Sequence, residues 1–207
     1  MIELKKATRS ELKRQAILTA ARQAFQEYGV QGTSMDTLAA MAQVSKRTVY
    51  NHFATKDALV LHLMTEMWQE ALQEIDVVYN PDQPLSPQLL ALVRAEMDVA
   101  CRPEYIDLMR VAFGYYFYNA DALQKEISRL TQQETAMIRW LKAAMDDKRL
   151  KPLDLELAST QLHSLYKGSS FWPQMLKLAP VPDEAQRQHI AEQAVAMFLS
   201  YYQSDKG

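Results

Sequence analysis

The sequence predicts an all-α protein of about nine helices, with an N-terminal three-helix domain followed by a larger helical domain. Three observations predict this fold class. Apolar residues recur at spacings of three and four along most of the 207 residues, glycine occurs only five times, and no segment alternates apolar and polar residues as a half-buried strand does. A chain of this length can bury one large core or two smaller ones.

The first helix is expected over residues 10–28. Its apolar residues share one face, and Gly29 follows it as a left-handed helix cap. The residues on this face are Ile17, Ala20, Ala21, Ala24, Phe25 and Tyr28.

Residues 32–59 predict two short helices joined by a tight turn, followed by the start of a third helix. Thr33 stands where the N-cap of the first short helix belongs, and Asp36 three residues later imitates a capping box. Gln43 and Val44 form the turn, and Ser45 is a good N-cap for the second short helix. This arrangement is typical of a helix-turn-helix, whose second helix enters the major groove of DNA.

The second short helix has distinct inner and outer sides. Val49 and Phe53, four residues apart, are expected to face inward. Basic and hydrogen-bonding side chains then face outward or lie near the rim, namely Lys46, Arg47, Thr48, Asn51 and His52. Lys56 lies in the first turn of the following helix, where exposed backbone N–H groups favour a phosphate.

Prolines and capping residues divide the rest of the chain into further helices. Ser86 and Pro87 start one helix, Pro103 another, and Asp183 caps the last. The expected ranges are 56–78, from 86, 103–119, 121–147, from 154 with an interruption near 172, and from 184.

At these residues the sequence resembles the TetR family of transcriptional regulators. The residues that meet the family pattern are Thr33, Ala39, Ala42, Val44, Ser45, Tyr50, His52, Phe53, Lys56 and Leu59. There are two departures. Gln43 replaces the turn glycine and must adopt an unfavourable left-handed conformation or distort the turn, and Arg47 replaces a second glycine with a side chain that can read bases.

The resemblance implies a DNA-binding domain over residues 1–55 and an effector-binding and dimerisation domain over residues 56–207. It further implies a homodimeric repressor, paired through its last two long helices, that binds a palindromic operator and is released by a small apolar or aromatic effector. The residues expected to contact double-stranded DNA are Thr33, Ser34, Ser45, Lys46, Arg47, Thr48, Tyr50, Asn51, His52 and Lys56.

Methionine and aromatic side chains of the second domain are candidates for the effector pocket, because they form soft, adaptable linings. Each is also a candidate for ordinary core. The candidates are Met64, Met67, Trp68, Met97, Cys101, Phe113, Tyr116, Phe117, Met137, Trp140, Tyr166, Phe171 and Trp172. Acidic residues on the same helices, such as Glu66, Glu96 and Asp98, would favour a cationic ligand if they faced it.

Charge is distributed unevenly along the chain. Residues 1–57 contain nine Lys or Arg and five Asp or Glu, whereas the remaining residues contain fourteen and twenty. A basic head therefore attracts phosphate while an acidic body is repelled by it. No run approaches the ~20 apolar residues of a membrane span, and the single Cys101 suits a reducing compartment. We expect a cytoplasmic protein that associates with the nucleoid when bound to DNA.

Other function classes remain as alternatives. The four histidines show no metal-binding spacing, and no nucleophile or phosphate-loop motif is present, so we expect no enzyme, no cofactor and no metal site. A DNA-binding regulator without a small-molecule effector, gated by a protein partner or architectural in role, is a second alternative. An activator is a third.

Overall fold

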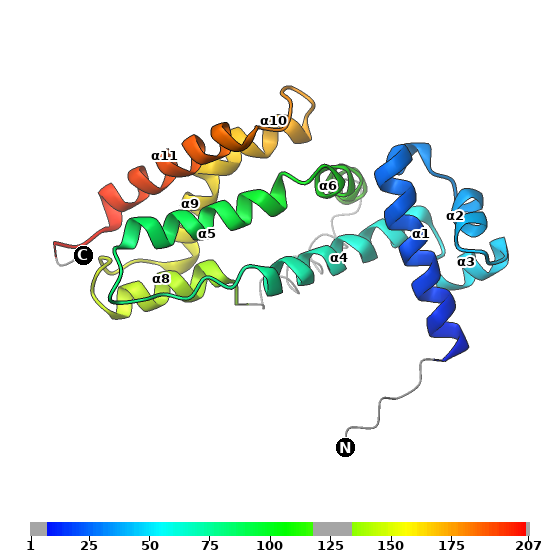
Figure 1. Ribbon diagram of the computed structural model, residues 1–207, viewed down its shortest axis with the longest axis horizontal. Coiled ribbons are helices and arrows are strands. Elements are labelled where there is room, and N and C mark those ends of the chain that lie inside the picture. The colour runs from blue at the N-terminus through cyan, green and yellow to red at the C-terminus, as the bar shows by residue number, and fades with distance from the viewer. Residues whose placement is uncertain (1–7, 118–133, 206–207) are drawn as a thin grey trace, which may run out of the picture. The chain divides into compact units, whose positions relative to one another are not determined.

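The computed structural model describes residues 8–117 and 134–205, and these residues form ten helices and no strand (Figure 1). The prediction of an all-α fold is therefore confirmed. None of the described helices is both long and apolar enough to cross a membrane.

The described residues form two compact units, each with its own apolar core. The first contains residues 8–67 and 107–117, and the second contains residues 68–106 and 134–205. Helix α4 (Lys56–Glu74) and helix α6 (Pro103–Phe117) contribute residues to both units. The boundary between these units does not lie at residue 55. A DNA-binding domain over residues 1–55 and an effector-binding domain over residues 56–207 stay a prediction.

The first unit is built on a long helix that packs against two short ones (Figure 1). These helices are α1 (Arg9–Gly32), α2 (Met35–Met41) and α3 (Lys46–His52). Thr8 starts α1 with a capping box. Its hydroxyl accepts from the backbone N–H of Glu11, and the Glu11 carboxylate accepts from the backbone N–H of Thr8. Gly29 interrupts α1 with a φ of 70°, as its sequence position predicts, and one further turn follows.

The start of α2 differs from the expected one by a residue. Ser34, not Thr33, is the N-cap, and its hydroxyl accepts from the Thr37 backbone N–H at 3.0 Å. Thr33 instead closes α1 and is buried. The two residues are adjacent hydroxyl-bearing candidates, so the sequence pattern alone could not separate them.

The turn between α2 and α3 is a Schellman motif. The backbone N–H of Val44 donates to Ala39 and that of Gln43 donates to Ala40, while Gln43 adopts a φ of 54°. The left-handed conformation expected from the missing turn glycine is therefore confirmed. The same pair of hydrogen bonds ends two other helices, where Lys148 and Lys177 take the left-handed position.

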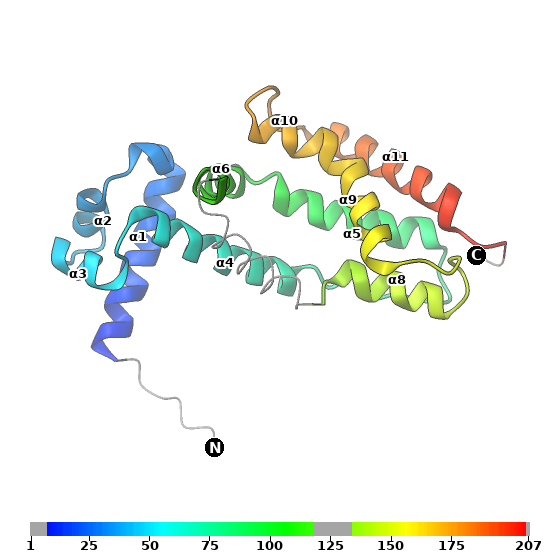
Figure 2. The ribbon, with the colours of Figure 1, turned by 180° about the vertical axis from the view of Figure 1, so that it is seen from behind.

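The second unit contains five complete helices. They are α5 (Leu85–Ala100), α8 (Ala136–Asp146), α9 (Leu155–Ser170), α10 (Trp172–Met175) and α11 (Glu184–Tyr202). Helix α11 packs against both α5 and α9, and α8 and α10 also contact α9 (Figure 2). Asp183 caps α11 as predicted, and Asp154, from which a helix is expected, is the N-cap of α9.

Other helix boundaries also differ from the expected ones. Helix α4 ends at Glu74 rather than near residue 78, and α5 begins at Leu85, which places Ser86 inside its first turn. A continuous helix over 121–147 is wrong, because Thr135 is extended and caps a new helix at Ala136 by accepting from Ile138. The part of that expected helix over 121–133 lies outside the described residues.

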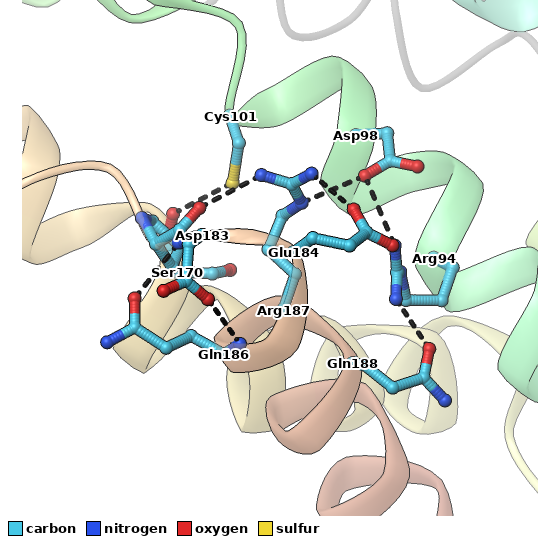
Figure 3. Close-up of polar contacts among 10 residues, drawn as sticks. Arg94, Asp98, Cys101, Ser170, Asp183, Glu184, Gln186, Arg187 and Gln188 are labelled. Atoms are coloured by element: carbon cyan, nitrogen blue, oxygen red, sulfur yellow. Dashed lines mark hydrogen bonds and ion pairs between the residues drawn. The ribbon is translucent and has the colours of Figure 1, made fainter.

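Charged side chains fasten α11 to α5 (Figure 3). Arg94 of α5 pairs with Glu184 and donates to the side chain of Gln188 on α11. Nε of Arg187 on α11 lies 3.0 Å from a carboxylate oxygen of Asp98 on α5, and the Arg187 guanidinium also pairs with Glu184. Each acid in this network therefore already has a cationic partner.

We expect Gln43→Gly to raise the free energy of unfolding by about 0.5–1 kcal/mol, because glycine removes the left-handed penalty but increases the entropy of the unfolded chain. Urea denaturation followed by circular dichroism measures this difference. Gln43→Ala is the control, since it keeps the Cβ atom and should give no gain. Equal stability of the Gly and Ala variants would contradict strain at this turn.

Candidate nucleic-acid interface

One side of α3 exposes side chains that can contact bases. Arg47, Tyr50 and Asn51 are exposed, and no described residue hydrogen bonds to the side chain of Arg47 or Asn51. Val49 and Phe53 are buried, which confirms the predicted inner side of this helix. A short helix held by two buried anchors can present an arginine fork and an amide to the edges of guanine and adenine.

Other predicted contact residues cap or border α3. Ser45 is its N-cap, and the hydroxyl accepts from the Thr48 backbone N–H at 3.1 Å while also contacting the Thr48 hydroxyl at 2.8 Å. Thr48 and His52 are half-buried. Ser34 performs the same capping for α2 and is exposed. These hydroxyl groups lie at the start of α2 and α3, but part of their hydrogen-bonding capacity is already used.

Lys46 is paired within the protein. Its Nζ lies 2.8 Å from a carboxylate oxygen of Asp36 on α2, and this hydrogen bond raises the pKa of the lysine. Both side chains are largely exposed, so the pair contributes little to stability. A phosphate that binds Lys46 must compete with Asp36.

Thr33 and Lys56 satisfy backbone carbonyl groups at the end of α1. The Thr33 hydroxyl donates to the carbonyl oxygens of Ala24 and Gly29 at 3.2 and 2.9 Å. The Lys56 ammonium donates to the carbonyls of Val30 and Thr33 at 2.9 and 3.2 Å. Both residues therefore have a structural role that the sequence pattern does not indicate. Their contact with DNA stays a prediction.

A second set of contacts joins α1 to α4. Arg14 lies 2.9 Å from Nε2 of His62, and its guanidinium stacks over the Phe53 ring at 5.1 Å from the centroid. Glu66 pairs with both Arg22 and His62 at 3.2 Å. The only sequence signal for this network was the spacing of four between His62 and Glu66.

Two family matches cover most of the chain. Residues 17–63 match the family described as bacterial regulatory proteins, tetR family, and residues 87–204 match that described as AefR-like transcriptional repressor, C-terminal domain. A TetR family transcriptional regulator from Pseudomonas syringae pv. tomato str. DC3000, known from its crystal structure, is 37% identical. That similarity covers 93% of this chain and 98% of the other, with a TM-score of 0.73.

The chain belongs to the TetR family of transcriptional regulators. It is therefore a DNA-binding regulator, and the TetR resemblance seen in residues 33–59 is confirmed.

Two further regulators are similar to this chain. An uncharacterized HTH-type transcriptional regulator of Bacillus subtilis, YhgD, is 24% identical over 74% of this chain and 80% of its own. The flavonoid-responsive regulator FrrA is 25% identical over 93% of this chain and 98% of its own, with a TM-score of 0.61.

The predicted effector-pocket residues divide between the two units. In the first unit Met64 is buried, Met67 and Phe113 are half-buried and Phe117 is exposed. In the second unit Met97, Cys101, Met137, Trp140, Tyr166 and Phe171 are buried, Trp68 is half-buried and Trp172 is partly exposed. The side chain of Tyr116 lies outside the described residues. Four of them, Met97, Met137, Trp140 and Tyr166, belong to the core of the second unit, and their pocket role stays a prediction.

We expect Arg47→Ala to reduce discrimination between the operator and single-base variants by about 1–3 kcal/mol, because a bidentate arginine contact specifies guanine. Fluorescence anisotropy with duplexes that differ at one position measures this loss. An unaltered operator preference would remove Arg47 from base readout.

We expect Lys56→Met to lower the free energy of unfolding by about 1–3 kcal/mol, since two carbonyl groups lose a charged donor. Lys46→Met is the matched control, because it removes only an exposed ion pair and should leave stability nearly unchanged. Both are measured by urea denaturation. If Lys56→Met kept full stability and instead weakened all DNA duplexes equally, Lys56 would be a phosphate contact without a structural role.

Proposed function

We propose that this protein is a homodimeric repressor that binds a palindromic operator through α3 and is released by a small apolar or aromatic effector. The exposed side of α3 is the observation that carries this proposal. Arg47, Tyr50 and Asn51 are accessible there, while Val49 and Phe53 fix the helix to the core of the first unit. Base-reading side chains on a rigidly anchored helix suit sequence-specific binding.

The comparisons support repression and an aromatic effector. The family that matches residues 87–204 is described as a transcriptional repressor C-terminal domain. FrrA, which is similar over nearly the whole chain, is flavonoid-responsive, and flavonoids are aromatic compounds.

Exposed apolar residues on α9 and α11 support dimerisation through these helices. Leu157 and Leu165 are eight residues apart on α9, and Met197 and Tyr201 are four apart on α11, so each pair shares one helix face. Met197 and Tyr201 are 57% and 69% exposed. Exposed apolar faces of this kind mark interfaces between proteins. A second copy of the chain, related by a two-fold axis, would cover them and present a second α3 to a palindrome.

Release by an effector requires two states of the dimer with different spacing of the DNA-reading helices. Helix α4 is continuous from Lys56 to Glu74 and contributes to both units, so a shift of this helix reaches both. The effector needs a preference of only about 1–3 kcal/mol for the released state.

Selection of random duplex DNA on the purified full-length protein at about 150 mM salt, followed by sequencing, tests the proposal. We expect a two-fold symmetric consensus, which identifies target genes whose products indicate the effector. The double variant R47A/N51A is the control, because it removes exposed side chains without disturbing the buried anchors. Retention of DNA without a consensus and with a steep salt dependence would contradict a specific repressor.

We expect Leu165→Glu combined with Met197→Glu to raise the dimer dissociation constant by about 100-fold or more. Each substitution removes one buried apolar side chain from both subunits. Burial of such a side chain stabilises the dimer by about 1.5–3 kcal/mol. Analytical ultracentrifugation measures the constant. Val78→Glu is the control, since Val78 is 75% exposed but lies outside α9 and α11. An unchanged dimer in the double variant would place the interface elsewhere.

A further inference from the structure

Three side chains from different elements of the first unit contact one another and form what we call the Arg14 triangle. Arg14 belongs to α1, Phe53 is the C-cap of α3, and His62 lies on α4. Cζ of Arg14 lies 5.1 Å from the centre of the Phe53 ring, and its Nη2 atom is 2.9 Å from Nε2 of His62. The rings of Phe53 and His62 are 5.7 Å apart. Each member of the triangle therefore contacts the other two.

Phe53 is one of the two buried anchors that fix the direction of α3. This helix has only seven residues, which is too few for stability without tertiary contacts. Val49 is its buried residue, and Phe53, which is 5% exposed, closes its C-terminal end by donating its backbone N–H to the Val49 carbonyl oxygen at 2.9 Å. A displaced Phe53 ring would therefore leave the last turn of α3, which carries the exposed Asn51, without support.

A further pair of contacts extends the Arg14 triangle along α1 and α4. Oε1 of Glu66 lies 3.2 Å from Nε2 of His62, one turn earlier on α4, and Oε2 of Glu66 lies 3.2 Å from the Arg22 guanidinium on α1. Arg22 follows Arg14 by about two turns of α1, so side chains join α1 to α4 at two levels. The place of the His62 ring in the triangle therefore depends on Glu66.

Arg14 differs from the other cations near the start of α1 in where its charge lies. Arg9 and Lys13 are exposed, whereas Arg14 is half-buried and contacts Phe53 and His62. A guanidinium is flat and weakly hydrated, so it can lie over an aromatic ring and donate hydrogen bonds from its edge at the same time. An ammonium group is a compact, strongly hydrated point charge. The triangle therefore requires an arginine and not merely a positive charge.

We infer that Arg14 is a positioning residue for DNA readout, which sets the direction of α3 through Phe53 and His62 and does not itself bind a phosphate. The three mutual contacts carry this inference, because they join the end of α3 to both α1 and α4. Side chains that read bases must be held to within about 0.5 Å by neighbours that are themselves fixed. That α3 contacts the operator is taken from the proposed function, on which this inference rests.

Amide hydrogen exchange of the DNA-free, full-length protein, followed by NMR, is the first test. We expect Arg14→Met and Arg14→Lys to increase the exchange rate of the Phe53 amide about tenfold or more, because the last turn of α3 opens more often. Lys13→Met, which removes an exposed charge from the same helix, is the matched control and should leave this rate unchanged. An unchanged Phe53 rate in both Arg14 variants, or an equal increase at the amides of α1, would overturn the inference.

Fluorescence anisotropy with the selected operator and a scrambled duplex, at about 50 to 200 mM salt, is the second test. We expect Arg14→Lys to weaken operator binding about tenfold while binding to the scrambled duplex and the salt dependence stay nearly the same. A phosphate contact predicts a different pattern, since lysine would keep it. Arg14→Met would then weaken both duplexes equally and lower the slope of log K against log salt by about 0.9. That pattern would overturn the inference.

Glu66→Gln distinguishes positioning from charge by the sign of its effect. On charge alone, removal of a carboxylate should tighten binding to every duplex. Because Glu66 holds His62, we expect this variant to weaken operator binding several-fold instead. Glu27→Gln, which removes an exposed carboxylate from α1, is the matched control and should not weaken it. Tighter operator binding by both variants alike would overturn the inference.

The exchange measurement needs no DNA and therefore separates this inference from the proposed function. Faster exchange at Phe53 in the Arg14 variants of a protein that selects no operator would support the fixing of α3 by Arg14 and contradict the specific repressor. Operator binding retained in full by Arg14→Lys would overturn the inference and leave the repressor in place.

Discussion

The DNA-binding unit depends on how the carbonyl groups at the end of α1 are satisfied. Gly29 breaks this helix, and buried carbonyl oxygens without donors would be costly. Thr33 and Lys56 supply the donors, and through them the end of α1, the entry to α2 and the start of α4 meet at one place. Because α3 is anchored on the same core by Val49, the orientation of its exposed side chains follows from this meeting point.

In the second unit, α9 has an exposed apolar side and a side that contacts Glu96 of α5. Leu157 and Leu165 lie on its exposed apolar side, while His163 and Tyr166 contact the buried Glu96. The helix that a second subunit would cover in the proposed dimer therefore also holds the partners of Glu96. The ion pairs between α5 and α11 hold α11, the other helix of the proposed interface, against the helix that carries Glu96.

Local chemistry made much of the fold predictable. Ser45 and Asp183 cap helices where the sequence places them, and Val49 and Phe53 face inward as their spacing requires. Contacts between residues far apart in the chain were not predictable. The task of Lys56 depends on a carbonyl 26 residues away, and the hydrogen bond from Tyr166 to Glu96 joins residues 70 apart. The candidate pocket residues shared only a composition, which does not distinguish core from lining, and many of them are core.

The ion pair between Lys46 and Asp36 has a consequence for the search along the chromosome. A lysine that must leave a carboxylate to bind a phosphate contributes less to the free energy of DNA binding than an unpaired lysine does. This holds for a duplex of any sequence. Weak retention by random sequence shortens each non-specific encounter. The exposed Arg47 has no such acidic partner among the described residues, so the base contact proposed for it would meet no competitor within the protein. In the proposed complex, Asp36 would therefore reduce binding to DNA of random sequence more than binding to the operator.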